Sequence, residues 1–139
     1  MKYLLDTNIV SDLVSNPHGR ITQKIRVVGE QNVCTSIIVS AELRYGATKK
    51  QSHRLTSQLE AILRVLEILP FEAPADAVYG LLCSRLEQAG TLIGGNDLLI
   101  AAQALAYDLT IVTDNEREFS CVDDLVVENW LRYHYGARL

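Results

Sequence analysis

Short runs of β-branched and apolar residues alternate along this chain with longer segments of helical periodicity, and this alternation restricts the fold more than any other feature. The runs typical of strands cover residues 1–5, 33–35, 67–70, 109–113 and 125–127. Strands that are separated by helices pair in parallel, and the helices then cover both faces of the sheet. The sequence therefore predicts an α/β fold with a central, mainly parallel sheet of four to five strands.

The segments between these runs carry apolar residues at helical spacing. We expect helices over residues 7–14, 21–29, 37–49, 55–66, 74–90 and 97–107. Capping residues support several of these boundaries: Ser36 precedes the third helix, Asn96 precedes the last, and Asp6 or Thr7 begins the first.

Length and composition limit the class of protein. The chain has 139 residues, of which 48% are hydrophobic and 22% charged, which is typical of one compact globular domain, and we expect residues 1–139 to form it. Cys34, Cys83 and Cys121 lack C-x-x-C spacing, which predicts reduced thiols and gives no support for zinc. No signal peptide or membrane-spanning segment is visible. We therefore expect a cytoplasmic protein without membrane association.

The net charge of −4 argues against a polyanionic partner, yet the charges are unevenly distributed. Basic residues gather between positions 20 and 54, namely Arg20, Lys24, Arg26, Arg44, Lys49, Lys50 and Arg54. The chain from residue 55 onward is strongly acidic. Ordinary solvated helix faces explain this pattern, and a basic binding flank is the alternative. The asymmetry alone identifies no substrate.

Two acidic residues directly follow expected strands. Asp6 ends the first strand, and Asp114 follows the strand that finishes at Thr113. The carboxyl ends of parallel strands meet at one edge of the sheet, where α/β folds bind ligands. Each acid also has a simpler interpretation, Asp6 as a helix N-cap and Asp114 with Asn115 as a turn.

Two further acidic residues lie on the apolar faces of expected helices. These are Glu42 and Asp97, and a carboxylate in such a position is costly unless it is paired or binds a metal. The alternatives are a structural ion pair between Glu42 and Arg44, and a capping role for Asp97, although Asn96 is already available for the cap.

If these four acids converge, their mutual repulsion raises one another's pKa or requires a cation. An oxygen-only cluster without His or Cys selects a hard ion such as Mg²⁺ or Mn²⁺. Such an ion can activate a water and neutralise charge on a phosphodiester, as in acid-lined nuclease sites. A bound metal would therefore reconcile an acidic protein with a polyanionic substrate.

Other chemistries have less support. His18, His53 and His134 lack the spacing of metal ligands, and no G-x-S-x-G, Walker or G-x-G-x-x-G motif follows a strand. Phosphorylation of Asp6, as in a phosphatase or receiver-like domain, usually involves a second Asp two residues later, where this chain has Asn8.

Four motifs, in this order along the chain, carry a resemblance to a known family. They are Leu5-Asp6-Thr7-Asn8; Ser40-Ala41-Glu42-Leu43 with Tyr45-Gly46; Ile93-Gly94-Gly95-Asn96-Asp97-Leu98-Leu99-Ile100-Ala101-Ala102; and Thr113-Asp114-Asn115 before Glu118-Phe119. The sequence resembles PIN domains, specifically the VapC toxins of type II toxin–antitoxin systems, over nearly its whole length.

The resemblance implies a PIN-like three-layer α/β/α sandwich and a Mg²⁺-dependent endoribonuclease, with Mn²⁺ as a substitute ion. Asp6 and Asp97 match the family's principal metal ligands, Glu42 matches the acid that completes the site, and Asp114 falls where relatives have Asp or Asn. The resemblance further implies that Thr7 and Asn8 orient Asp6, and that Thr113 and Asn115 support the acidic groove that these four acids line. Gln103 stands where many similar sequences have His.

The resemblance also implies partners: a VapB-type antitoxin that covers the acidic groove, a homodimer, an RNA substrate and operator DNA bound only through the antitoxin complex. Family members cut different RNAs, including tRNA and the anticodon stem-loop of initiator tRNA. The aromatic residues Trp130, Tyr133 and Tyr135 either serve the dimer or pack within the chain. The competing hypothesis is a PIN-like binding module with negligible catalysis that acts with an antitoxin in operator repression.

Overall fold

A five-stranded parallel sheet forms the centre of the protein. The computed structural model describes residues 2–132, so Met1 of the first expected strand and the aromatic residues Tyr133 and Tyr135 lie outside it. The strands are β1 (Tyr3–Leu5), β2 (Val33–Ser36), β3 (Glu67–Leu69), β4 (Thr110–Val112) and β5 (Val127–Glu128), in the order β3-β2-β1-β4-β5. All four pairings are parallel, which confirms the predicted fold class.

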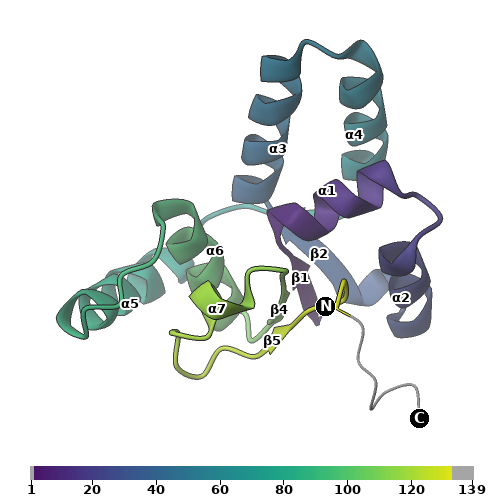
Figure 1. Cartoon of the computed structure of the whole chain (residues 1–139). Coiled ribbons are helices and arrows are strands. Elements are labelled where there is room, and N and C mark those ends of the chain that lie inside the picture. The colour runs from purple at the N-terminus through teal and green to yellow at the C-terminus, as the bar shows by residue number, and fades with distance from the viewer. Residues whose placement is uncertain (1, 133–139) are drawn as a thin grey trace.

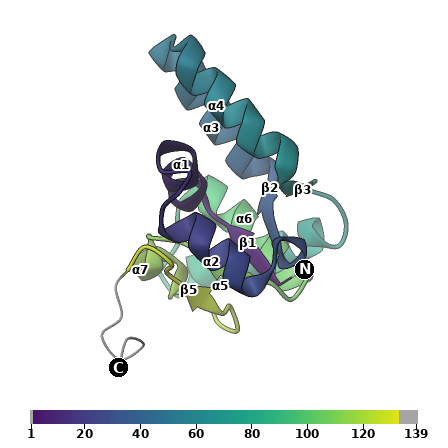
Figure 2. The same ribbon diagram turned by 90° about the vertical axis from the view of Figure 1, so that its right-hand side faces the viewer.

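Helices lie on both sides of this sheet. They are α1 (Thr7–Ser15), α2 (Arg20–Val28), the 3-10 turn η1 (Glu30–Asn32), α3 (Ile37–Lys50), α4 (His53–Val65), α5 (Ala75–Gln88), α6 (Gly95–Ala106) and α7 (Glu116–Phe119). Figures 1 and 2 show α1 and α2 on one side of the strands and α5 and α6 on the other. Within residues 2–132 there is no helix with both the length and the apolar character needed to cross a membrane.

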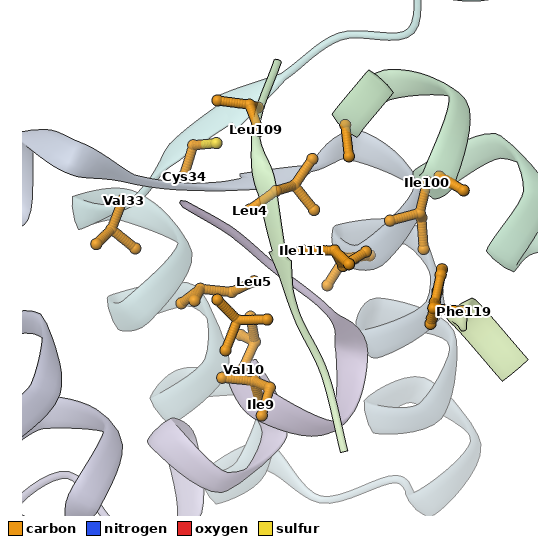
Figure 3. Packing of buried hydrophobic residues seen from close by; sticks show 14 of the residues in the cluster. Leu4, Leu5, Ile9, Val10, Val33, Cys34, Ile100, Leu109, Ile111 and Phe119 are labelled. Atoms are coloured by element: carbon orange, nitrogen blue, oxygen red, sulfur yellow. The ribbon is translucent and has the colours of Figure 1, made fainter. Parts of the chain in front are cut away.

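The core lies on both faces of the central strands β1 and β4. Leu4, Leu5 and Ile111 have no solvent exposure, and the apolar faces of the neighbouring helices pack against them, as Figure 3 shows for Ile9 and Ile100. A strand buried on both faces needs apolar residues in succession rather than in alternation. This explains why so short a segment as β1 can occupy the middle of the sheet.

Helices α3 and α4 form a hairpin that projects beyond the sheet (Figure 1). The Ser36 side chain accepts a hydrogen bond from the backbone nitrogen of Ile38 and caps α3, as predicted. Further along the hairpin, the guanidinium of Arg44 donates two hydrogen bonds of 2.8 Å to the carboxylate of Glu60. This bidentate pair joins the two helices on their exposed surface.

Gln103 joins α6 to the ends of two strands. Its side chain is fully buried, and its Nε2 donates to the carbonyl oxygens of Leu69 at 3.2 Å and Pro70 at 3.1 Å. Its Oε1 accepts a hydrogen bond from Ser36 Oγ. One amide therefore connects the helix that carries Asp97 to the residue that caps the helix that carries Glu42.

Most predicted boundaries agree with the structure to within about two residues, but the sequence mislocated the start of α6 and the last strand and missed one short helix. Asn96 does not cap the last long helix: α6 already begins at Gly95, and Gly94 is the N-cap, because the backbone nitrogen of Gly94 donates to Glu118 and fixes the start of the helix. The short helix α7 was not expected, since four residues carry no periodic signal. The last strand, expected over residues 125–127, is Val127–Glu128, where it pairs with β4.

Candidate active site

Asp6 lies at the carboxyl edge of the sheet, directly after β1. Its backbone nitrogen donates to the carbonyl of Val112 on β4, and its side chain is only 3% exposed. Thr113, the residue after β4, donates a hydrogen bond of 2.7 Å from Oγ1 to Asp6 Oδ2. Asp6 occupies the N-cap position of α1, yet within residues 2–132 its side chain forms no capping bond to that helix. The capping interpretation therefore does not account for this carboxylate.

Burial is the largest influence on the pKa of Asp6 and raises it above the ordinary value. Hydrogen bonds from Thr113 and from the backbone of Thr7 oppose that rise, while the charges of Glu42 and Glu118 add to it. Asp6 is thus a buried carboxylate in contact with donors and in the electrostatic field of other acids.

Glu42 reaches the same edge from the second turn of α3. Its Oε1 accepts a hydrogen bond of 2.7 Å from Thr7 Oγ1. Arg44, the partner considered for a structural ion pair, binds Glu60 instead. The sequence predicted that Glu42 lies on an apolar face of α3. Tyr45 on this face is 68% exposed, so the face borders solvent. Glu42 is therefore half-buried at the margin of the site.

Asp97 lies in the first turn of α6 and is half-buried. Its pKa is raised to about 7, chiefly by burial, then by a hydrogen bond with Glu118 and by the charges of Asp6, Glu118 and Glu42. Asn115 Nδ2 lies 3.5 Å from Asp97 Oδ2. A carboxyl that keeps its proton near neutral pH marks a place where negative charge is concentrated.

Glu118 on α7 is an additional acid, for which the sequence predicted no role beyond its place in the fourth motif. Its Oε1 accepts from the backbone nitrogen of Gly94 at 2.7 Å, and its Oε2 accepts from Asn115 Nδ2 at 2.6 Å. These bonds lower its pKa, the Gly94 bond having the largest effect. Because the four residues of α7 carry no periodic signal, the sequence offered no further indication of this role.

Asp114 faces a different neighbour. It is exposed, and its Oδ1 accepts a hydrogen bond of 2.9 Å from Asn129 Nδ2. Its backbone nitrogen donates to Asn8 Oδ1 at 2.8 Å, so Asn8 holds the loop after β4 rather than the carboxylate of Asp6. Thr7, by contrast, contacts both Asp6 and Glu42. Asn115 donates its backbone nitrogen to Thr113 Oγ1, which keeps that threonine aimed at Asp6.

The structure therefore brings Asp6, Glu42, Asp97 and Glu118 within electrostatic reach of one another. Residues 2–132 contain no three His, Cys, Asp or Glu side chains already grouped to hold a metal ion. The fit to a divalent cation rests instead on an oxygen-only donor set, which suits a hard cation, and on the raised pKa values of Asp6 and Asp97. Burial is the largest cause of both rises, and the charges of the neighbouring acids add to it. The arrangement can hold a cation beside an oriented, buried carboxylate.

Comparison with known proteins identifies the family. The family model described as "PIN domain" matches residues 3–125. A protein named ribonuclease VapC2 from Rickettsia felis is 40% identical over 132 residues, which cover 94% of this chain and 98% of that protein. The chain belongs to the VapC family of PIN-domain proteins.

The VapC relationship extends to more distant sequences and to solved structures. A protein named tRNA(fMet)-specific endonuclease VapC from Shigella flexneri is 31% identical over 131 residues, covering 94% of this chain and 98% of that protein. A crystal structure of VapBC2 from Rickettsia felis bound to a promoter DNA fragment contains a similar chain, with a TM-score of 0.86 and 39% identity over 94% of this chain and 99% of that one. The VapC fold predicted from the sequence is therefore confirmed.

Proposed function

We propose that this chain is a metal-dependent endoribonuclease that acts as the toxin of a type II toxin–antitoxin system. The observation that carries the proposal is the acidic site at the carboxyl edge of the sheet, where burial, followed by a hydrogen bond with Glu118 and the charges of Asp6, Glu118 and Glu42, raises the pKa of Asp97 to about 7. The ribonuclease and endonuclease names of the VapC relatives support the reaction class.

Asp6, Glu42 and Asp97 would hold Mg²⁺ or Mn²⁺, with Glu118 or Asp114 as the fourth carboxylate. When bound, the ion would supply activation of a water for attack on phosphorus and neutralisation of charge on the phosphodiester. The chain itself orients the acids: Thr113 and the backbone of Thr7 fix Asp6, and the hydroxyl of Thr7 fixes Glu42. Such supporting bonds hold ligands in one geometry before the metal and substrate arrive.

RNA is the proposed substrate, and tRNA, including initiator tRNA, is the first class to test. The name of the Shigella flexneri relative points to that class. Among the basic residues between positions 20 and 54, Arg44 is occupied by Glu60. Exposed cations on the same hairpin, Lys49 and Lys50, are the better candidates for contact with the phosphate backbone.

The proposed partners are a VapB-type antitoxin, a second copy of the chain, and operator DNA through the antitoxin complex. Solved structures of related chains are VapBC complexes, one of them bound to promoter DNA. A groove of about 190 Å³ between α1, α3 and α4, lined by Glu42, Leu43, Gly46 and Leu59 among others, offers an antitoxin segment a surface beside the site.

The test is cleavage of total tRNA by the purified, antitoxin-free protein, followed by sequencing of the RNA ends. We expect cleavage at defined positions with Mg²⁺, none in excess EDTA, and none by Asp6→Asn. Asp76→Asn is the matched control, because Asp76 is exposed on α5, away from the site, and this variant should cleave as the unaltered chain does. Cleavage that survives EDTA or Asp6→Asn would refute the mechanism. An absence of cleavage with retained antitoxin and DNA binding would indicate a binding module.

A further inference from the structure

Tyr45 is a large aromatic residue that the fold does not need for its core. Its side chain is 68% exposed, although it lies in the middle of α3 between the half-buried Glu42 and the buried Ala47. Aromatic side chains are usually covered because they bury a large apolar area. Tyr45 also lies outside the groove between α1, α3 and α4. Packing within the protein therefore does not explain why an aromatic residue occupies this position.

The position of Tyr45 relates it directly to the acidic site. It follows Glu42 by three residues and precedes Lys49 by four, so these side chains lie on one face of α3. Three residues of helix correspond to a rise of about 4.5 Å, and side chains tilt toward the helix N-terminus. The Cα–Cβ bond of Tyr45 therefore tilts toward the end of α3 that carries Glu42, which accepts the hydrogen bond from Thr7.

A cation accompanies the ring. The Nζ atom of Lys49 lies 6.0 Å from the centre of the Tyr45 ring, at the outer limit of a cation–π contact. A polyanion that approaches four carboxylates needs nearby positive charge, and Arg44 on the same helix is neutralised by Glu60. An exposed aromatic plane beside an ammonium group is the combination that single-stranded nucleic acid recognises, through base stacking and phosphate contact.

We propose that Tyr45 is a substrate-positioning residue whose ring stacks on an unpaired nucleobase next to the scissile phosphate, while Lys49 contacts a neighbouring phosphate. This inference rests on the proposed ribonuclease function. Stacking requires a base that is not already stacked in a duplex, so the site selects loops and single-stranded segments of RNA. Tyr45 touches substrate but takes no part in the chemistry.

The test compares Tyr45 with Phe, Leu and Ala variants in binding a short single-stranded oligoribonucleotide of mixed sequence. Binding is measured with Mg²⁺ on the full chain carrying Asp97→Asn, which prevents cleavage. We expect Tyr45→Phe to bind as the Tyr45 protein does, and Tyr45→Leu and Tyr45→Ala to bind about 5- to 150-fold more weakly, the range typical of base–aromatic stacking. Tyr107→Leu, a partly exposed tyrosine at the far end of α6, is the matched control and should bind normally.

Leucine separates stacking from simple apolar cover, because it keeps apolar area but has no aromatic plane. If Tyr45→Leu binds as well as Tyr45→Phe, or if the Tyr45 protein does not bind the probe, the proposal is overturned. It is also overturned if the variants leave RNA binding unchanged and alter only the oligomeric state or antitoxin binding, since Tyr45 then faces a protein.

A second readout separates this inference from the proposed function. In the otherwise unaltered chain, we expect Tyr45→Leu to raise KM for RNA more than it lowers kcat. Metal-dependent cleavage with equal KM for all the Tyr45 variants would refute stacking and leave the ribonuclease proposal intact. The opposite result is also informative. If the Tyr45 variants differ in RNA binding as expected but the unaltered chain cleaves no RNA, the ribonuclease proposal is refuted and the stacking of Tyr45 on a nucleobase stands.

Discussion

Thr113 Oγ1 donates a hydrogen bond of 2.7 Å to Asp6 Oδ2 across 107 residues of sequence. The two residues follow neighbouring parallel strands, β1 and β4, whose register places Leu5 beside Val112. The hydroxyl fixes one carboxylate oxygen and opposes the effect of burial on the pKa of Asp6. It therefore keeps a buried acid oriented and easier to ionise.

Thr113→Val tests this relationship, because valine keeps the shape of the side chain and removes the donor. We expect the apparent affinity for Mg²⁺, measured by metal titration of RNA cleavage, to fall by about 10- to 100-fold, the usual effect of losing a supporting bond to a metal ligand, which is the role proposed for Asp6. Thr110→Val on the same strand is the control and should titrate normally. Equal Mg²⁺ titrations for the two variants would exclude the role assigned to Thr113.

The raised pKa of Asp97 predicts how the stability of the metal-free protein depends on pH. Its ordinary pKa is 3.8 and its folded value is about 7, so the folded state retains a proton that the unfolded state releases between these values. The free energy of unfolding should therefore be highest at the acidic end of this window and fall as pH rises toward 7. Urea unfolding in EDTA at several pH values measures this. Asp97→Asn should flatten the dependence, and an unchanged slope would contradict the assignment.

Glu118 and Asp114 compete for the role of the fourth acid, and the structure distinguishes their surroundings. Glu118 forms a hydrogen bond with Asp97, whereas the Asp114 carboxylate is exposed and binds Asn129. We expect Glu118→Gln to reduce kcat/KM for RNA by at least an order of magnitude and Asp114→Asn to reduce it less. Both substitutions keep the shape of the side chain, so each is the control for the other. The reverse ranking would place Asp114 in the site.

Gln103→Ala should destabilise the fold. It removes the three hydrogen bonds of a fully buried side chain, leaves the carbonyls of Leu69 and Pro70 and the hydroxyl of Ser36 without this partner, and opens a cavity. The expected loss is about 2–4 kcal/mol in the free energy of unfolding, measured by urea denaturation. Gln88→Ala, at the exposed end of α5, should change it by no more than about 0.5 kcal/mol. Equal losses for both variants would contradict the role of Gln103.

Much of the fold was predictable because it depends on local patterns. Apolar runs located the strands, and the rule that parallel strands share one carboxyl edge is sufficient to place Asp6 and Thr113 together. The cap by Ser36 followed from residue type alone. These features require no knowledge of which helix packs against which.

The remaining features depend on contacts between distant segments. No local sequence pattern shows that Glu60 lies opposite Arg44 and forms an ion pair with it. Because Arg44 binds Glu60, the hydrogen-bond partner of Glu42 is Thr7 instead. Glu118 lies on a helix too short for a periodic signal. Its hydrogen bond with Gly94, which lies 24 residues earlier, occurs where α6 begins, and local sequence could not show that Gly94 rather than Asn96 is the N-cap. Sequence reasoning therefore located most of the candidate acids but not the partners that orient them.

The strand order also determines when the site can form during protein synthesis. β1 is made first, yet its neighbour β4 and the hydroxyl that orients Asp6 are made last among the central elements. Pairing across so long a stretch of chain cannot begin until translation has passed residue 113 and the segment has left the ribosome. A nascent or prematurely terminated chain that stops after Glu42 and before Asp97 contains Asp6 and Glu42 without Asp97, Thr113 or Glu118. The complete site can therefore form in the cell only after nearly the whole chain has been translated.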